Sequence, residues 1–297
     1  MTQAATKTAV AGKTLKAKKH SQWGDVFKRL TRNKLAMAGL VVIILIILVA
    51  IFADFIAPYD YKMQDYPNRL APLSWEHPLG TDEFGRDILS RIIYGARTSL
   101  LVALGGVSIC LVIGSILGLL AGYFGGWVES IIMRVMDIFM AIPYLLLAVT
   151  IQSALGEGIF NTMLAISLAG MPATCRVLRA SIITVRDQEF VEAGIATGSR
   201  SLRNMVRHVL PNTLAPLLVE TTLKIGSKIM GISSLSFVGL GVQAPLAEWG
   251  AMVSTGRTFI RDYAPLVVFP GLAIVLTLVA FNVLGDGLRD ALDPKLK

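Results

Sequence analysis

Three charged residues, Glu220, Lys224 and Lys228, interrupt a stretch of the chain that is otherwise apolar or small. Their i, i+4, i+8 spacing places them on one face of a helix. A charged side chain at membrane depth costs at least about 2.5–3.5 kcal/mol and rarely faces lipid. We therefore expect the stripe to line a water-filled translocation path, where its net positive charge would suit an anionic cargo.

A structural role for the same stripe is the alternative. Glu220 and Lys224 would then form an ion pair, and Lys228 would reach the lipid headgroups or bind another subunit. The two interpretations differ in where the two ammonium groups lie.

A second polar feature is the segment 192–212, which carries three arginines between apolar stretches. Residues 186–198 have the spacing of a short helix with one apolar face, with Asp187 as its N-cap, and Gly198 should end it. Ser199 then caps a second helix, 199–209, and Pro211 allows another to start. Such a unit needs something to pack against, either this chain or another protein.

Motifs for bond chemistry are absent from the sequence. It has no GxxxxGK[ST] loop, no HExxH, no Gly-x-Ser-x-Gly and no paired-cysteine pattern. Its histidines, His20, His77 and His208, fall outside the apolar runs, and Cys110 and Cys175 are expected to be free thiols. We expect no catalytic residue and no metal site, which leaves a transporter, a channel or a scaffold.

The elements that must hold these residues are membrane spans. The 297 residues are 54% hydrophobic and only 16% charged, whereas soluble domains carry about 25% charged residues. Five uncharged runs approach or exceed the roughly 20 residues of a spanning helix: 35–53, 98–128, 138–156, 158–175 and 263–285. The charged stripe lies in a sixth span, 213–237, so the chain is predicted to be an all-α integral membrane protein with six transmembrane helices.

The topology follows from the distribution of charge. Residues 1–34 contain nine Lys or Arg and one acid, so they should remain in the cytoplasm, and six crossings return the C-terminus to the same side. The first span reads as an uncleaved anchor. The basic tail is expected to hold the topology and to contact anionic membrane lipid, and no nucleic acid partner is expected.

Small residues predict close helix packing. Gly114, Gly118, Gly122 and Gly126 recur every four residues, on one helix face where a neighbouring backbone can approach. Pro143 and Pro172 suggest kinks in the third and fourth spans.

The polar segment carries a resemblance to a known family. Glu192-Ala193-Gly194, then Gly198, then Leu210-Pro211, resembles the "EAA…G…LP" loop of ABC importer permeases, although Gly194 replaces an alanine and His208 stands where isoleucine is frequent. The segments 77–100, 234–252 and 269–294 resemble the dipeptide, oligopeptide and nickel permeases, and the C-type subunit in particular. The resemblance covers about residues 25–297. In that family the face of the charged stripe usually lacks the two lysines and carries an acid near Gly231, so this chain departs from the pattern.

The resemblance implies the type I ABC importer permease fold in the plasma (inner) membrane of a prokaryote. It divides the chain into a basic cytoplasmic segment (1–34), a first transmembrane helix (35–57), an extracytoplasmic segment (58–97), a five-helix core (98–290) that includes a cytoplasmic coupling loop (181–211), and a cytoplasmic tail (291–297).

The resemblance also implies the other members of the transporter. They are a second, B-type permease that completes the path, two ABC ATPase subunits that bind ATP and Mg, and an extracytoplasmic solute-binding protein. The chain itself should need no cofactor. Peptides are the expected cargo because the spans contain no histidine; nickel or a metal chelate is the alternative in the same family, and an ATPase-independent channel or scaffold is the alternative from another class.

Overall fold

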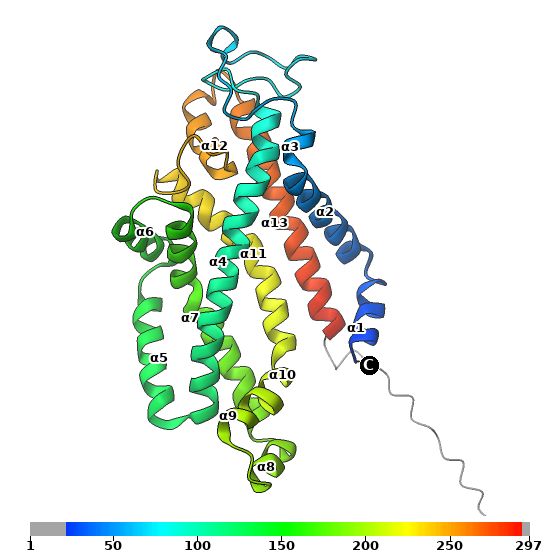
Figure 1. The fold of residues 1–297 in the computed structure, drawn as a ribbon, viewed down its shortest axis with the longest axis vertical. Coiled ribbons are helices and arrows are strands. Elements are labelled where there is room, and N and C mark those ends of the chain that lie inside the picture. The colour runs from blue at the N-terminus through cyan, green and yellow to red at the C-terminus, as the bar shows by residue number, and fades with distance from the viewer. Residues whose placement is uncertain (1–21, 293–297) are drawn as a thin grey trace, which may run out of the picture.

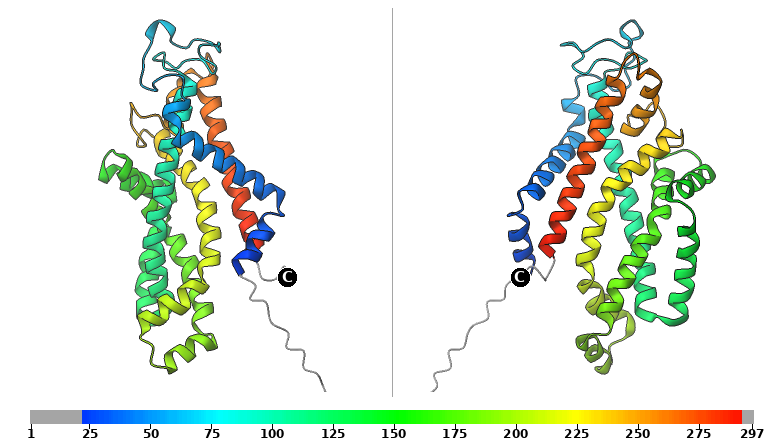
Figure 2. Two further views of the ribbon diagram at one scale, coloured as in Figure 1. Left: turned by 45° about the vertical axis from the view of Figure 1, so that its right-hand side comes forward. Right: turned by 180° about the vertical axis from the view of Figure 1, so that it is seen from behind.

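The computed structural model describes residues 22–292, and within that range the chain forms helices joined by turns and loops, with no strand. The helices form an elongated bundle that has α8 at one end and the long loop after α3 at the other (Figure 1). The views in Figure 2 show that α1 and the last turn of α13 lie together toward the α8 end.

Four helices are long and apolar enough to cross a membrane: α2 (Lys34–Ile51), α4 (Ile88–Phe124), α7 (Ile159–Arg186) and α13 (Pro265–Leu292). A further candidate is the pair α5 (Gly126–Ala141) and α6 (Tyr144–Leu155). The 24 residues of α11 (Leu214–Phe237) are also long enough to span, but the three charged residues of the stripe lower their apolar character.

Short helices connect these long ones. They are α1 (Gln22–Leu30), α3 (Ala53–Ile56), α8 (Glu189–Ala196), α9 (Ser201–Asn204), α10 (Leu210–Asn212) and α12 (Trp249–Gly256). A π-helical stretch, η2 (Met205–Val209), joins α9 to α10, and two 3₁₀ turns, η1 (Tyr66–Asn68) and η3 (Arg257–Phe259), lie toward the other end of the bundle.

The third predicted span, 138–156, is not a single helix. The chain breaks at Ile142 and Pro143, and the axes of α5 and α6 differ by 95°. Proline lacks the N–H that would continue the helical ladder and disfavours the helical conformation of the residue before it. The break is therefore a sharp bend instead of the kink expected from the sequence.

Helix α4 begins ten residues earlier than the predicted second span, at Ile88 in place of Thr98. The earlier start follows from Asp87, whose Oδ2 accepts a hydrogen bond from the Ser90 backbone N–H at 2.7 Å and so caps the helix. The result is a helix of 37 residues that continues into the segment expected to be extracytoplasmic.

Glycines on α4 bring it against α7. A Cβ placed on Gly114 would lie 2.9 Å from Thr174 Cβ, and one on Gly118 would lie 2.6 Å from the Cys175 carbonyl oxygen. Gly122 meets Ile182 in the same way. Gly126 does not belong to this face, because α4 ends before it and the structure places no atom within 4 Å of its Cβ direction.

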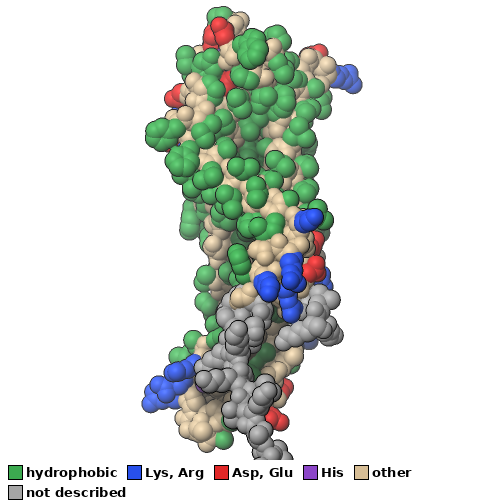
Figure 3. Space-filling model, turned by 90° about the vertical axis from the view of Figure 1, so that its right-hand side faces the viewer, with side chains coloured by type: hydrophobic (Ala, Val, Ile, Leu, Met, Phe, Trp, Pro, Cys, Tyr) green, Lys and Arg blue, Asp and Glu red, His purple; other side chains and the backbone are tan. Residues whose placement is uncertain are grey.

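The largest core cluster joins several of the long helices. Its buried members include Val102 of α4, Ile166 of α7, Ile229 and Ile232 of α11, and Phe281 of α13. The face over α2 and α13 is covered with hydrophobic side chains, and basic side chains gather below them toward the α1 end (Figure 3). This distribution is that of helices in contact with lipid and with other spans.

Candidate functional site

The polar segment 189–212 forms a compact unit at one end of the bundle. Val191 of α8 is completely buried and packs with Leu178 and Ile182 of α7 and with Met205 and Val209 of η2. One buried side chain thus fixes α8 to the end of a spanning helix. The segment 189–212 therefore packs on α7 of this chain through a small hydrophobic cluster.

Gly194 and Asn204 set the distance between α8 and α9. A Cβ on Gly194 would lie 2.8 Å from Asn204 Oδ1, and Asn204 Nδ2 donates a hydrogen bond to the Val191 carbonyl at 3.3 Å. Asn204 is fully buried. The glycine that departs from the family pattern therefore makes room for a polar contact that holds the two helices together.

The turn between the two helices depends on Gly198. Its φ of +81° lies in the left-handed region, where a side chain would be strained. The helix–glycine turn–helix order is therefore as the sequence predicts.

Both predicted caps in this segment are wrong. Asp187 follows the last residue of α7, and its Oδ1 accepts a hydrogen bond from Arg186 Nε at 2.9 Å, so it is not the N-cap of α8. This bond from Arg186 lowers the pKa of the Asp187 carboxyl. Ser199 caps no helix either, because α9 begins at Ser201 with Arg200 before it.

The outer face of the unit is apolar and open. Its exposed hydrophobic side chains are Phe190, Ile195, Leu202 and Val206. Glu192 and Ala193 are exposed beside them on α8, as is Pro211, whereas Leu210 is partly buried. An exposed apolar face flanked by polar residues is typical of a protein interaction surface.

The charged stripe lies on α11 beside α7. Lys224 Nζ forms an ion pair with Glu220 Oε1 at 2.5 Å and donates a hydrogen bond to Thr174 Oγ1 at 2.7 Å. Lys228 donates to the Ile166 carbonyl and lies over the ring of Tyr144, 5.2 Å from its centroid. The i, i+4 ion pair of the structural alternative is present, and Lys228 is 3% exposed.

These contacts correct part of the expectation for the stripe. Both ammonium groups are held by α7 of the same chain, so they are not freely hydrated. The reason is that α7 offers a hydroxyl and a backbone carbonyl at the right depth. Both lysines nevertheless line a cavity.

The cavity has a volume of about 510 Å³ and lies among α5, α6, α7 and α11. Its lining is mainly apolar, with two serine hydroxyls from α11, one tyrosine and the two lysines as its polar side chains. The lining includes Tyr144 of α6, Gly170 of α7, and Lys224, Lys228 and Gly231 of α11. A mostly apolar concave surface with a few convergent polar groups is typical of a ligand site.

Two glycines create the space in which the polar groups meet. A Cβ on Gly170 would collide with the Lys228 ammonium, and a Cβ on Gly231 would lie 2.7 Å from the Tyr144 hydroxyl. Lysine and tyrosine can therefore lie against α7 and α11 only because these positions have no side chain.

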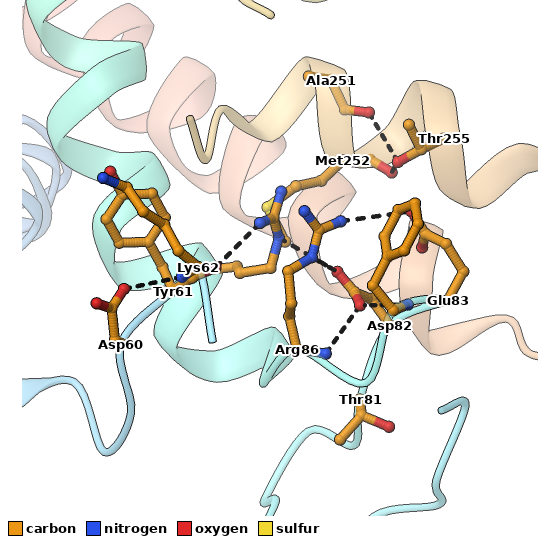
Figure 4. A network of polar contacts seen from close by, with 12 residues as sticks. Asp60, Tyr61, Lys62, Thr81, Asp82, Glu83, Arg86, Ala251, Met252 and Thr255 are labelled. Carbon is orange, nitrogen blue, oxygen red and sulfur yellow. Dashed lines mark hydrogen bonds and ion pairs between the residues drawn. The ribbon is translucent and has the colours of Figure 1, made fainter. Parts of the chain in front are cut away.

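The opposite end of the bundle contains a different charge cluster. Arg86 Nε donates to Asp82 Oδ2 at 2.6 Å, and Arg91 Nε lies 3.5 Å from the same oxygen. Arg91 Nη1 donates to the Tyr61 carbonyl, which links the long loop to α4. Figure 4 shows this network beneath α12, whose residues Met252 and Thr255 lie beside it. Burial, and then the neighbouring Asp82 charge, raise the pKa of Glu83.

Glu248 forms the second polar centre at that end. Its Oε1 accepts from Ser99 Oγ and the Gly250 N–H, and its Oε2 accepts from Ser236 Oγ and the Ala251 N–H, at 2.8–3.1 Å. This fully buried carboxylate caps α12 and joins it to α4 and α11. Four positions that shape these sites, Glu248, Asn204, Tyr144 and Gly170, were not predicted from the sequence. The available signals were the glycines at 170, 194 and 231 and the glutamate directly before Trp249 and Gly250.

Comparison with known proteins agrees with this architecture. Residues 114–297 match the family described as binding-protein-dependent transport system inner membrane component, and residues 21–72 match the N-terminal transmembrane domain of oligopeptide transport permease C. The chain belongs to this family of inner-membrane transport components. It is a multi-pass permease subunit of an ABC importer and does not itself catalyse ATP hydrolysis, which removes the channel and scaffold alternatives.

Curated relatives cover nearly the whole chain. The dipeptide transport system permease protein DppC of Alkalihalophilus pseudofirmus is 46% identical over 93% of this chain and 91% of its own length. The di/tripeptide transport system permease protein DppC of Pseudomonas aeruginosa is 46% identical over 92% of both chains. The glutathione transport system permease protein GsiD of Escherichia coli is 44% identical over 93% of this chain and 91% of its own.

A solved structure shows the same fold at lower identity. A chain of the MetNI methionine ABC transporter, in a structure of its inward-facing conformations, superposes with a TM-score of 0.56 at 17% identity. It covers 69% of this chain and 97% of the other. The likeness supports the type I importer permease fold.

Proposed function

We propose that this chain forms half of the translocation path of an ATP-driven importer of short peptides. The observation that carries the proposal is the joint presence of the two features just described: an apolar docking unit at one end and a cavity lined by Lys224 and Lys228 within the bundle. The cargo named for each of the three relatives is a peptide.

The unit 189–212 is the coupling element of this proposal. Its exposed residues Phe190, Ile195, Leu202 and Val206 would meet an ATPase subunit, while the buried Val191 transmits displacement to α7. A short helix fixed by a buried contact and a glycine turn moves as one body. Closure of the ATPase subunits would then change the packing of the spans between two discrete arrangements.

The other members of the importer follow from the family. An importer of this kind requires a partner permease, ATPase subunits and a binding protein. We propose a B-type permease across the cavity, two ABC ATPases that bind ATP and Mg on the side of α8, and a solute-binding protein at the end that carries the long loop. We propose that α1 and the end of α13, which lie toward the α8 end, face the cytoplasm. The predicted basic tail before Gln22 and the cytoplasmic tail after Leu292 lie outside the described residues.

Ile195→Glu tests the coupling role. Ile195 is 57% exposed, so the substitution should leave the fold intact while it places a charge in the docking face. In the purified complex we expect ATPase subunits to dissociate and peptide-stimulated ATP hydrolysis to fall by about tenfold or more.

Thr31→Glu is the matched control, because Thr31 is exposed in the turn between α1 and α2, away from α8 (Figure 1). It should leave hydrolysis unchanged. Normal hydrolysis and peptide uptake in the Ile195 variant would contradict the assignment of α8.

A further inference from the structure

Lys228 is a buried cation without an acidic partner. Within residues 22–292, the structure gives its ammonium two contacts, the Ile166 carbonyl and the Tyr144 ring, and no carboxylate. Lys224, one turn away, has Glu220. A buried ammonium is costly unless an anion compensates it, and a carbonyl and an aromatic face compensate it only in part.

The cavity beside Lys228 has room for such an anion. Its lining includes no Asp or Glu, so its charged groups are the two lysines. The volume of about 510 Å³ is within the range of sites for small ligands. Apolar side chains make up most of the remaining lining, among them Met140, Leu145 and Met230. A ligand that fits this surface has a carboxylate at one end and an apolar group next to it.

The geometry around Lys228 is also preorganised. Gly170 leaves space for the ammonium against α7, and Gly231 leaves space for the Tyr144 hydroxyl on α11. The Lys228 ammonium lies 5.2 Å from the centroid of the Tyr144 ring, and both side chains line the cavity, so the ammonium and the phenol are two donors beside the same space. A carboxylate accepts two such hydrogen bonds with its two oxygens.

We propose that Lys228 and Tyr144 form a subsite of the permease that binds the carboxylate of the cargo peptide. The adjacent peptide side chain lies against the apolar lining. When no cargo is present, the Ile166 carbonyl is the acceptor for the ammonium, so that binding exchanges one acceptor for a stronger one. This inference rests on the proposed peptide import and names the part of the peptide that the cavity recognises.

The test uses the complete importer, with both permeases, the ATPases and the binding protein, reconstituted in proteoliposomes. Uptake of an alanyl-phenylalanine dipeptide is compared with uptake of its C-terminal amide, which lacks the carboxylate charge. The same binding protein is used with every variant, so its own preference cancels in the comparison between variants.

Lys228→Gln should lower uptake of the dipeptide by about tenfold and uptake of the amide by less than about twofold. Lys228→Arg should keep most of the preference. Gly170→Ala retains the lysine but places a methyl group where the ammonium lies, so it should reproduce the selective loss. Arg32→Gln, which changes an exposed basic residue between α1 and α2, is the matched control and should leave both rates unchanged.

Equal reduction of both rates, or no reduction, in the Lys228→Gln and Gly170→Ala variants would overturn the subsite. Loss of the B-type permease from the Lys228→Gln complex would also overturn it, because the missing anion would then belong to the partner. A wild-type complex that imports neither peptide and shows no peptide-stimulated ATP hydrolysis would instead contradict the proposed function.

Discussion

The two buried charge clusters of this chain differ in how they are balanced. At the end of the bundle that carries the long loop, Arg86 and Arg91 meet Asp82 and Glu83, so two cations are matched by two acids. In the cavity, Glu220 matches Lys224, and Lys228 has no acid within the described chain. A balanced cluster is complete in the folded chain, whereas an unbalanced one favours a ligand or a partner.

The balance of charge in a buried cluster indicates whether the cluster stabilises the fold or binds something else. Removing one member of a balanced buried cluster leaves its partner without compensation and should destabilise the fold. Removing an unbalanced charge should leave the fold intact and affect only what binds there. Five substitutions test this contrast.

The largest effect is expected for Asp82→Asn. Asp82 accepts from Arg86 and lies near Arg91, so its neutralisation leaves buried guanidinium groups without their main acid. We expect a loss of about 3–5 kcal/mol in stability, measured as a lower thermal unfolding midpoint of the purified complex. Asp262→Asn, which changes an exposed acid before α13, should have no effect. An unchanged midpoint for the Asp82 variant would show that the network is not structural.

Glu248→Gln should have the next largest effect. Each carboxylate oxygen accepts from one backbone N–H, so an amide nitrogen in either position faces a donor. The expected cost is about 1–3 kcal/mol, with faster hydrogen exchange at residues 249–252. Glu76→Gln, at an exposed acid in the long loop, is the control. Exchange at wild-type rates would contradict the role of Glu248 as the link between α12 and the bundle.

The two lysines of the stripe provide a direct comparison. Lys224→Met removes the partner of Glu220 and should lower the unfolding midpoint by an amount equivalent to about 1–2 kcal/mol. Lys228→Met removes a buried cation without an acid, so the midpoint should stay the same or rise. Both proteins are measured in the same detergent. A larger loss for the Lys228 variant would reverse the assignment of balanced and unbalanced charge.

The smallest effect concerns pH. Burial raises the pKa of Glu83 above its ordinary value, so the folded chain holds this proton more tightly than the unfolded chain does. The stability that Glu83 contributes is therefore present below its ordinary pKa and is lost as pH rises through the raised value. Glu83→Gln should flatten the fall of the unfolding midpoint that accompanies a rise of pH above the ordinary pKa of a glutamate, measured as thermal unfolding at a series of pH values. An identical pH profile would contradict the shift.

Patterns within one element were predicted well from the sequence. The i, i+4 spacing gave the Glu220–Lys224 pair, and Gly198 gave the turn after α8. The ion pair and the turn each depend only on residues a few positions apart in the sequence, so the spacing of those residues is enough to predict their geometry. Apolar length in the same way predicted the four long helices α2, α4, α7 and α13, whereas the third predicted span is the bent pair α5 and α6, and the charged one is the helix α11.

Features that depend on distant segments were missed. The acceptor of Lys228 is a carbonyl 62 residues earlier, and Gly170 admits the ammonium only because α7 packs on α11. Asp187 has the residue type of an N-cap, but the adjacent Arg186 binds it and α7 extends up to it. Pro143 predicts that the helix breaks but not the angle between its two halves. The 95° angle between α5 and α6 depends on how α6 packs on α7.

The length of α4 has a mechanical consequence. Its 37 residues extend over about 55 Å, whereas the hydrocarbon core of a bilayer is about 30 Å thick. One end of α4 packs through Gly122 on Ile182 of α7, close to the unit 189–212. The other end of α4 carries Arg91, which lies 3.5 Å from Asp82 in the charge cluster beneath α12. In a rod of that length, a tilt of about 5° moves the far end by ~5 Å. A small angular displacement where ATPases would dock therefore becomes a shift as wide as a peptide backbone on the opposite side of the membrane.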